Sequence, residues 1–382
     1  MPTDPYLRLS DLSRVVHREI VILVVLAAAA GGLFIVTRAA ASGNREQQLV
    51  DAAAWYERGQ GYLATHATEQ AVAALRRAVA RRPDEWTYAR TLAEALVQDG
   101  RTDSARQLLL LWRTRQPDDA DVNTRLARLE AAAGDVAAAT DYYEDALHGR
   151  WPADAGPARL DLRREVIRLL LSTGNAGAAL SHILTLAANL PDETAAQSQV
   201  AGLFLDAGDP ARALEHYQRA LRLAPTDATA RAGAAAAAFG LNDYTRALAY
   251  ARNLTDERSR RIAAVSEAVA ASDPLIPRLS GAERERRLAA GIALAAGQLD
   301  ACRKRSRART PLAERSAAAV ADALADFDRT LTPRRVRESP EVLDRGLELV
   351  ASALSVVAAQ CAPLDVRAEA LQRVARRHGS AE

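Results

Sequence analysis

The segment from Ala52 to Glu85 reads AAAWYERGQGYLATHATEQAVAALRRAVARRPDE and is 34 residues long. Its marked residues stand at unit positions 4, 8, 11, 20, 24, 27 and 32: Trp55, Gly59, Tyr62, Ala71, Leu75, Ala78 and Pro83. Small residues at positions 8 and 20 let two helices approach closely, and large residues at positions 4, 11 and 24 fill the remaining space. Proline at position 32 ends the second helix, because it lacks an N–H and disfavours the helical region for its predecessor. The segment therefore predicts two packed helices joined by a turn.

The same pattern returns along the chain with a period of 34 residues, as in the pairs Pro83–Pro117 and Pro191–Pro225. Further units begin at residues 86, 120, 160 and 194, and a degenerate unit begins at residue 228. The third unit departs from the period, since its closing proline is displaced to Pro152 and six additional residues, 154–159, follow. One such unit cannot bury its apolar face alone, so the units are expected to stack.

Glycine marks the turn between the two helices in four of the units. A residue with positive φ ends a helix there, and glycine adopts this conformation without a steric cost. The four residues are Gly100, Gly134, Gly174 and Gly208.

This pattern resembles the tetratricopeptide repeat family, whose signature has Trp, Leu, Gly, Tyr, Ala, a large apolar residue, Ala and Pro at these positions. The first unit matches at all of them except position 7, where Arg58 replaces Leu. The resemblance covers residues 52–261 and implies an all-α fold, a superhelical solenoid of helix-turn-helix repeats.

The resemblance also implies a peptide-binding groove, lined by positions 2, 5, 9, 12 and 13 of each first helix. Positions 5 and 9 share one helix face because they lie four residues apart. In the five units they are Tyr56 and Gln60, Arg90 and Glu94, Thr124 and Arg128, Arg164 and Arg168, and Ser198 and Gly202.

Four of these groove residues are arginines: Arg90, Arg128, Arg164 and Arg168. Guanidinium groups match carboxylates, so an acidic or C-terminal segment of a partner is the expected guest. The alternative is that these are solvated arginines paired with Glu94, Asp121 and Asp161. The family's clamp for heat-shock chaperone C-termini is not implied, because it needs Lys and Asn at positions 5 and 9 of the first unit.

A membrane anchor is expected at residues 20–37, which read IVILVVLAAAAGGLFIVT without a charge. At a rise of 1.5 Å per residue they span about 27 Å, close to the roughly 30 Å hydrocarbon thickness. Residues 1–19 form a short tail before the anchor, and residues 38–51 form a linker after it. A cleaved signal peptide and a buried core helix are the alternatives, but the apolar run is longer than the usual signal core.

The flanking charges favour an N-terminus inside the cytoplasm. Arg8, Arg14 and Arg18 precede the apolar run, whereas Arg38 and Arg45 follow it. The bulk of the chain is then expected in the periplasm of a bacterium, as a single-pass inner-membrane protein. The opposite topology is the alternative.

Residues 262–382 lose the repeat period but keep helical signals, so a C-terminal helical domain is expected. Ser280 and Glu283 fit a capping box at the start of one helix, and Pro311 and Asp365 fit the starts of two others. Outside the cytoplasm its cysteines, Cys302 and Cys361, are expected either to form one disulfide or to be two buried thiols.

Composition and missing motifs restrict the function. A net charge of +2 gives no reason to expect a nucleic-acid partner. The six histidines form no zinc motif, and no phosphate-binding glycine loop or catalytic serine elbow is found. We therefore expect no cofactor, no metal and no catalytic residues, and predict that the chain is not an enzyme. The 86 alanines and 4% aromatic content favour helices over strands.

The sequence thus predicts a membrane-anchored scaffold that binds peptide or helical segments of envelope proteins in its concave groove. A structural accessory subunit of a stable membrane complex is the alternative. An enzyme with an unrecognised C-terminal site is a third reading. The sequence does not predict an oligomeric state.

Overall fold

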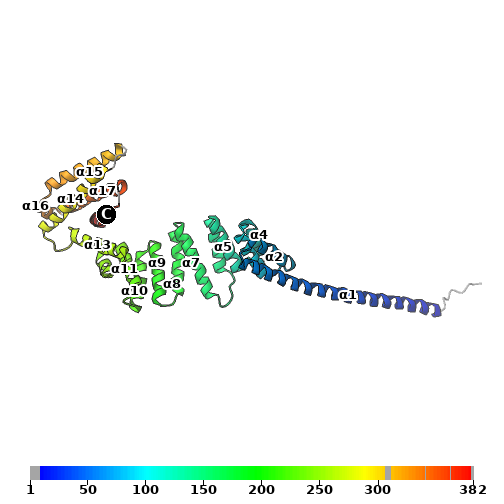
Figure 1. Ribbon diagram of the computed structural model, residues 1–382. Helices are drawn as coiled ribbons and strands as arrows, with labels where there is room; N and C mark the ends of the chain where they lie inside the picture. Colours follow the sequence, from blue (N-terminus) through cyan, green and yellow to red (C-terminus); the bar gives the residue numbers. More distant parts are fainter. Residues whose placement is uncertain (1–8, 306–310, 340, 362, 380–382) are drawn as a thin grey trace, which may run out of the picture. The chain divides into compact units, whose positions relative to one another are not determined.

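The computed structural model describes residues 9–305, 311–339, 341–361 and 363–379. These residues are predominantly helical (Figure 1), and within the described ranges no strand is found beyond one isolated bridge between Asp119 and Arg150. The predicted all-α fold of paired helices is confirmed. The chain divides between Leu162 and Arg163 into two compact units, and each is described by itself.

The first unit consists of successive helices, each packed on the next as far as α6. They are α1 (Leu9–Ala64), α2 (Thr68–Arg81), α3 (Trp86–Gln98), α4 (Thr102–Arg115), α5 (Ala120–Ala133), α6 (Val136–His148) and the first residues of α7 (Gly156–Ser172).

Helix α1 is continuous from the apolar segment into the first repeat. The expected linker at residues 38–51 is helical instead of irregular. Its sequence is compatible with a helix, since it contains three alanines and two glutamines and no proline. The apolar segment and the first repeat therefore share one helix.

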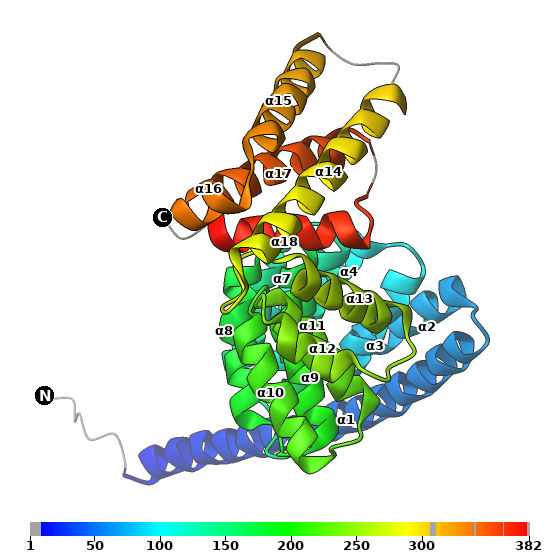
Figure 2. The same ribbon diagram turned by 90° about the vertical axis from the view of Figure 1, so that its left-hand side faces the viewer.

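The second unit continues the helix pairs and then adds the C-terminal helices (Figures 1 and 2). Its further helices are α8 (Ala176–Asn189), α9 (Thr194–Asp206), α10 (Pro210–Leu223), α11 (Ala228–Gly240), α12 (Tyr244–Ala251), α13 (Glu257–Ser272), α14 (Gly281–Arg305), α15 (Pro311–Thr330), α16 (Pro333–Glu338), α17 (Glu341–Gln360) and α18 (Val366–Gly379).

The repeats and the C-terminal helices meet at α13. Residue 261, where we placed the end of the repeats, lies inside this helix. One apolar core includes Tyr244 of α12, Val265 of α13 and side chains from α14, α15, α17 and α18. Helix α18 packs directly on α13, so residues 366–379 cover the end of the repeat array. The short helix α16 was not predicted.

The expected start signals of the C-terminal helices are present. Ser280 Oγ accepts a hydrogen bond of 3.1 Å from the Glu283 backbone N–H, and Asp365 Oδ1 accepts one of 2.8 Å from Ala368. Each satisfies a backbone donor that the first turn of a helix leaves without a partner.

The turn between paired helices has the same backbone conformation in all six units. Its residue at position 15 has positive φ, between 57° and 84°. Glycine occupies it in the four predicted cases, and His66 and Asn242 occupy it in the first and last units. The geometry of the turn thus requires positive φ at position 15. Residues other than glycine also adopt this conformation in the first and last units.

The seam between paired helices depends on alanine at position 20. All six such residues have no exposed surface: Ala71, Ala105, Ala139, Ala179, Ala213 and Ala247. Gly59 shows how tight the seam is, since a Cβ placed there would lie 2.6 Å from Leu75 Cγ. Because adding even one methylene group to a close-packed interior forces side chains to shift, larger residues at this seam should destabilise the repeat.

The aromatic positions of the first unit only partly match the expectation. Tyr143, Phe204 and Tyr217 are buried as predicted for later units, but Tyr62 is 38% exposed. Trp55 is half-buried, and the guanidinium groups of Arg58 and Arg77 lie 4.7 and 4.4 Å from its ring centroid. Arg58, the one mismatch to the signature, therefore contributes a cation–π contact.

Polar side chains replace the aromatic residue at position 4 in the fourth and fifth units, and each contacts a histidine at position 23. His182 Nδ1 accepts from Arg163 at 3.4 Å, and His216 Nδ1 donates to Gln197 Oε1 at 2.7 Å. The His216 ring also stacks on Phe204, with 5.3 Å between centroids. Burial first, and then the charge of Arg219, lower the pKa of His216 below 6.5, while Glu215 opposes this.

We predict that Ala213→Leu lowers the free energy of unfolding by roughly 1–3 kcal/mol, because the larger side chain overpacks the seam. Ala211→Leu on the same helix is the control, since Ala211 is exposed. Urea denaturation measures both. Equal stability of the two variants would contradict the register.

We predict that His216 makes the fold less stable in acid. Its folded pKa is lowered, so its contribution is complete above the ordinary value of 6.5 and is lost as pH falls through the folded pKa. The free energy of unfolding should therefore fall more steeply below pH 6.5 in the native protein than in His216→Gln. Parallel pH profiles would show that His216 does not contribute.

Candidate functional site

A cleft of about 290 Å³ opens between the first helices of the second and third repeats. It is lined by Ala93, Glu94, Val97 and Gln98 of α3, Leu109 of α4, and Arg125, Arg128, Leu129 and Ala132 of α5. Two of these residues, Glu94 and Arg128, occupy the groove position 9 of their repeats. The cleft therefore coincides with part of the surface that the repeat pattern assigned to a guest.

Positions 5 and 9 differ in how deeply they are set. At position 9, Gln60, Arg128 and Arg168 are exposed, and Glu94 and Gly202 are half-buried. At position 5 the residues are half-buried or buried: Tyr56, Arg90, Thr124, Arg164 and Ser198. None of the residues at position 5 is exposed, whereas three of the five at position 9 are.

The first repeat shows the reason directly. Tyr56 stacks on Tyr88 of the second repeat, with ring centroids 4.5 Å apart. Its hydroxyl lies 3.2 Å from Thr91 Oγ1 and accepts a hydrogen bond of 3.0 Å from Gln60 Nε2. Tyr56 thus holds two first helices together, and Gln60 is the residue of this pair that reaches the surface.

Thr124 is also turned away from a guest. It is 7% exposed, and its hydroxyl donates to the Ala120 carbonyl at 2.7 Å.

Among the groove arginines, Arg90 is half-buried, and its Nε has no hydrogen-bond partner in the described part of the chain. Arg164 and Arg168 belong to the second unit.

Arg125 was not predicted, yet it organises the charges of this cleft. Its guanidinium lies 2.8 Å from Glu94 Oε1 and 3.0 Å from Asp121 Oδ1. Asp121 also accepts a hydrogen bond of 3.1 Å from Trp86 Nε1. Two of the three carboxylates named as alternative partners of the groove arginines, Glu94 and Asp121, thus contact Arg125. The four-residue spacing of Asp121 and Arg125 was the available signal for one of these contacts.

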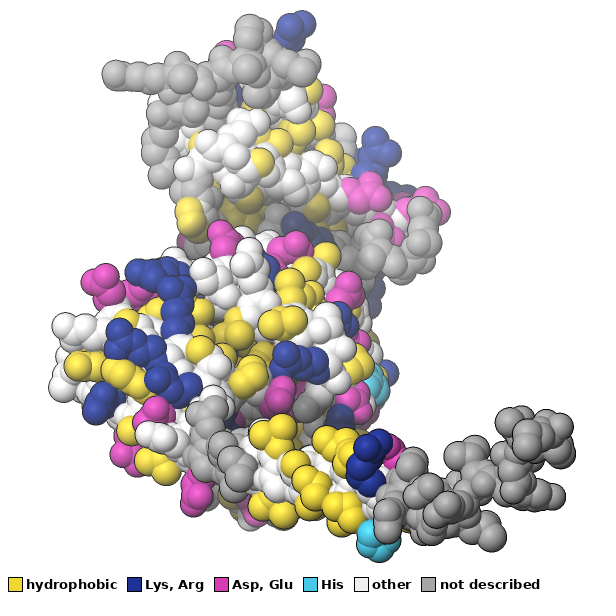
Figure 3. Space-filling model, turned by 90° about the vertical axis from the view of Figure 1, so that its right-hand side faces the viewer, with side chains coloured by type: hydrophobic (Ala, Val, Ile, Leu, Met, Phe, Trp, Pro, Cys, Tyr) yellow, Lys and Arg dark blue, Asp and Glu magenta, His cyan; other side chains and the backbone are white. Residues whose placement is uncertain are grey.

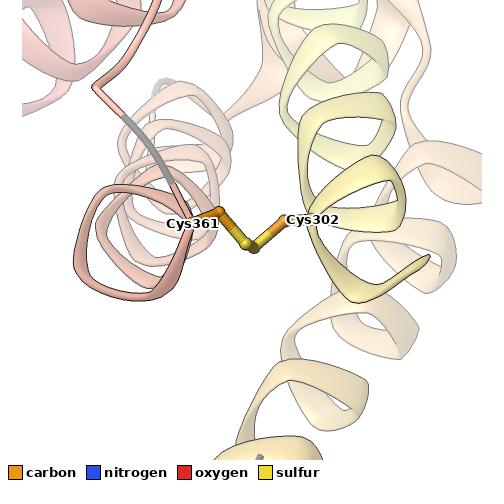
Figure 4. Close-up of a disulfide and its surroundings, with 2 residues drawn as sticks. All are labelled: Cys302 and Cys361. Carbon is orange, nitrogen blue, oxygen red and sulfur yellow. A yellow bond between two sulfur atoms is a disulfide. The ribbon is translucent and has the colours of Figure 1, made fainter. Parts of the chain in front are cut away.

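The two cysteines lie far from this cleft in the sequence. Cys302 at the end of α14 and Cys361 just after α17 are joined by a disulfide, with 5.7 Å between their Cα atoms (Figure 4). Cys302 is fully buried. The bridge ties the ends of two core helices together across 59 residues of sequence.

Comparison with known protein families decides what these repeats are. A sequence model of the tetratricopeptide repeat matches residues 62–129 and 204–271, and a second model of this repeat matches residues 165–228. The chain is a tetratricopeptide-repeat protein. Proteins with these repeats are in general non-enzymatic scaffolds, and the repeats support a protein–protein interaction scaffold as the function class of this tetratricopeptide-repeat protein. None of the curated proteins compared with it matches.

Several solved structures are similar to the tetratricopeptide-repeat protein. Pseudomonas aeruginosa pilF is 16% identical with a TM-score of 0.37, covering 55% of this chain and 90% of that one. PilW, a type IV pilus biogenesis factor, is 18% identical with a TM-score of 0.36, and the match covers 55% of this chain and 97% of that one. YrrB, described as having an unusual peptide-binding site, is 15% identical with a TM-score of 0.35, and the match covers 51% of this chain and 94% of that one.

The N-terminal helix of the tetratricopeptide-repeat protein carries an apolar segment. Val16–Ile35 are 20 residues with a mean hydropathy of 2.2, long and apolar enough to cross a membrane, and none is buried. Figure 3 shows hydrophobic side chains at the surface of this projecting helix. In the described part of the chain, no cluster of three or more His, Cys, Asp or Glu residues could hold a metal ion.

We predict that the disulfide stabilises the C-terminal helices. Closing a loop of about 60 residues contributes roughly 4 kcal/mol in the chain-entropy model. A reducing agent should therefore lower the free energy of unfolding of the native protein, and should not affect Cys302→Ala/Cys361→Ala. Mass spectrometry of the membrane-extracted, non-reduced protein should find the bridged peptide, and free thiols at both residues would contradict it.

Proposed function

We propose that this tetratricopeptide-repeat protein is a membrane-anchored scaffold that binds peptide or helical segments of envelope proteins along the first helices of its repeats. The observation that carries the proposal is the cleft between α3 and α5, because groove residues from two consecutive repeats line it. Its floor includes Leu109 and Leu129, which are almost fully buried, so an apolar side chain can rest there beside charged rims.

The chemistry of the guest follows from the arginines. Arg128 lines the cleft and its side chain is exposed, so its guanidinium is accessible to a guest. Arg125 already forms ion pairs with the carboxylates of Glu94 and Asp121. A side-chain or C-terminal carboxylate of a partner would form a charge-assisted hydrogen bond with Arg128.

The apolar part of α1 supports the membrane anchoring. Of the 20 exposed residues Val16–Ile35, those from Ile20 onward carry no charge, and such a stretch is unfavourable in water and favourable in a bilayer. An anchor would confine the repeats to one membrane and raise their effective concentration near other envelope proteins. The charge bias around this segment and the disulfide both favour a periplasmic location for the repeats.

We predict that changing Arg90, Arg128, Arg164 and Arg168 to serine reduces recovery of envelope partners at least about tenfold, because charge-assisted contacts are lost. Partners are captured by pull-down from detergent-solubilised membranes and quantified by mass spectrometry. The control changes four exposed arginines outside the groove positions: Arg76, Arg222, Arg258 and Arg260.

Unchanged recovery with the groove variant would contradict the proposal. Blue-native electrophoresis of the same samples separates the alternative function. A large complex that persists in the groove variant would identify an accessory subunit of a stable assembly.

A further inference from the structure

A second groove, of about 410 Å³, lies in the C-terminal region between α13, α14 and α18. Its floor is apolar and made mainly of Ala268, Ala271, Ala290, Gly291, Leu294 and Leu371. Three arginines from α14 and α18 line its edge: Arg286, Arg287 and Arg367. None of these residues belongs to the first helices of the six repeats.

The floor of this groove is closed by tight packing of two helices. Leu371 is 4% exposed, and a Cβ on Gly291 would lie only 3.1 Å from Leu371 Cδ2. Glycine therefore lets α14 approach α18 closely, which leaves a shallow depression in place of a side chain. Ala271 and Ala290 are exposed beside it, so a guest can reach apolar surface without displacing any part of the fold.

The edge of the groove is positively charged, and ion pairs and hydrogen bonds hold two of its arginine side chains in place. Arg286 and Arg287 share one carboxylate, Glu283, at 3.0 and 2.9 Å. The hydrogen bond from Arg287 is the main reason that the pKa of Glu283 is lowered. Arg287 also donates to the carbonyls of Ala270 and Asp273, each at 3.0 Å, so its guanidinium is held rigidly.

Arg367 adds a further positive charge from the first turn of α18. Its side chain is exposed, and among the described residues it makes no ion pair. Two guanidinium groups thus share one carboxylate and the third makes no ion pair in the described part of the chain, which leaves an excess of positive charge beside the apolar floor.

We propose that this groove is a second docking site, which binds an acidic segment of a partner protein that carries an apolar side chain. The carboxylates would meet Arg286 and Arg367, and the apolar side chain would rest on the alanine and leucine floor. The volume, near the lower end of the roughly 300–1,000 Å³ of ligand sites, suits one or two side chains better than an acyl chain. The proposal does not depend on the groove of the repeats.

The test measures fluorescence anisotropy of short fluorescein-labelled peptides with the full chain in a non-ionic detergent. The probe is GDELLEDG, and the two matched probes are GKRLLRKG, with reversed charge, and GDESSEDG, without leucine. Binding should be confined to the first probe and should weaken with added salt, because the contacts of the edge are ionic.

Two variants and their controls locate the binding. Ala290→Trp fills the groove and Arg367→Glu reverses its charge, and each should weaken binding about tenfold or more. Ala282→Trp on the same helix and Arg345→Glu on α17 change exposed residues outside the groove and should bind as the native protein does. Circular dichroism and melting verify that all four variants are folded.

Equal affinity of the groove variants and their controls would overturn the proposal, as would an absence of binding to every probe. A second arm titrates a short-chain phosphatidylglycerol. Binding of this lipid that is lost in the groove variants, without peptide binding, would assign the site to lipid and also overturn the proposal. Loss of peptide binding in Arg90→Ser/Arg128→Ser, with native binding in Ala290→Trp and Arg367→Glu, would assign the peptide to the repeat groove and overturn the proposal, so failure of this site and failure of the repeat groove are distinguishable.

Discussion

The structure depends on the close approach of the two helices within each repeat. Alanine at position 20 makes that approach possible, and each of the six alanines there is completely buried. A short seam fixes how far apart the paired helices sit, and the turn with positive φ fixes how they reverse direction. With both constraints met, the first helices of successive repeats come together and form the surface on which the cleft lies. The high alanine content is therefore partly a packing requirement and not only a helix preference.

The sequence was sufficient to predict features that arise within one repeat. Position 20 and the four turn glycines depend on contacts a few residues apart, and the 34-residue period repeats them. The starts of α14, α15 and α18 were also predictable, because caps act locally. Likewise the slippage after the third repeat was visible from Pro152, and Arg150 there pairs with Asp118 at 2.7 Å.

Features that depend on neighbouring elements could not be predicted as well. Tyr56 and Thr124 share a helix face with exposed residues, but packing between repeats buries them to different degrees. Helix α1 continues through residues 38–51, which the sequence predicted only as a linker between the anchor and the first repeat. The end of the repeats within α13 follows from α18, which lies about a hundred residues later and supplies the packing partner. Arg125 was missed because its contact with Glu94 crosses from one repeat to the next.

The central claim is that exposed residues on the first helices of the repeats contact a partner. The direct measurement is site-specific photo-crosslinking in intact cells, with a photoreactive amino acid at Gln60 or Arg128 and, for comparison, at Leu111 or Leu223. The last two are exposed residues on the second helices α4 and α10. The account predicts that a discrete crosslinked protein forms from Gln60 and Arg128 and not from Leu111 and Leu223. Crosslinks of equal yield from all four positions, or from the second helices alone, would contradict it.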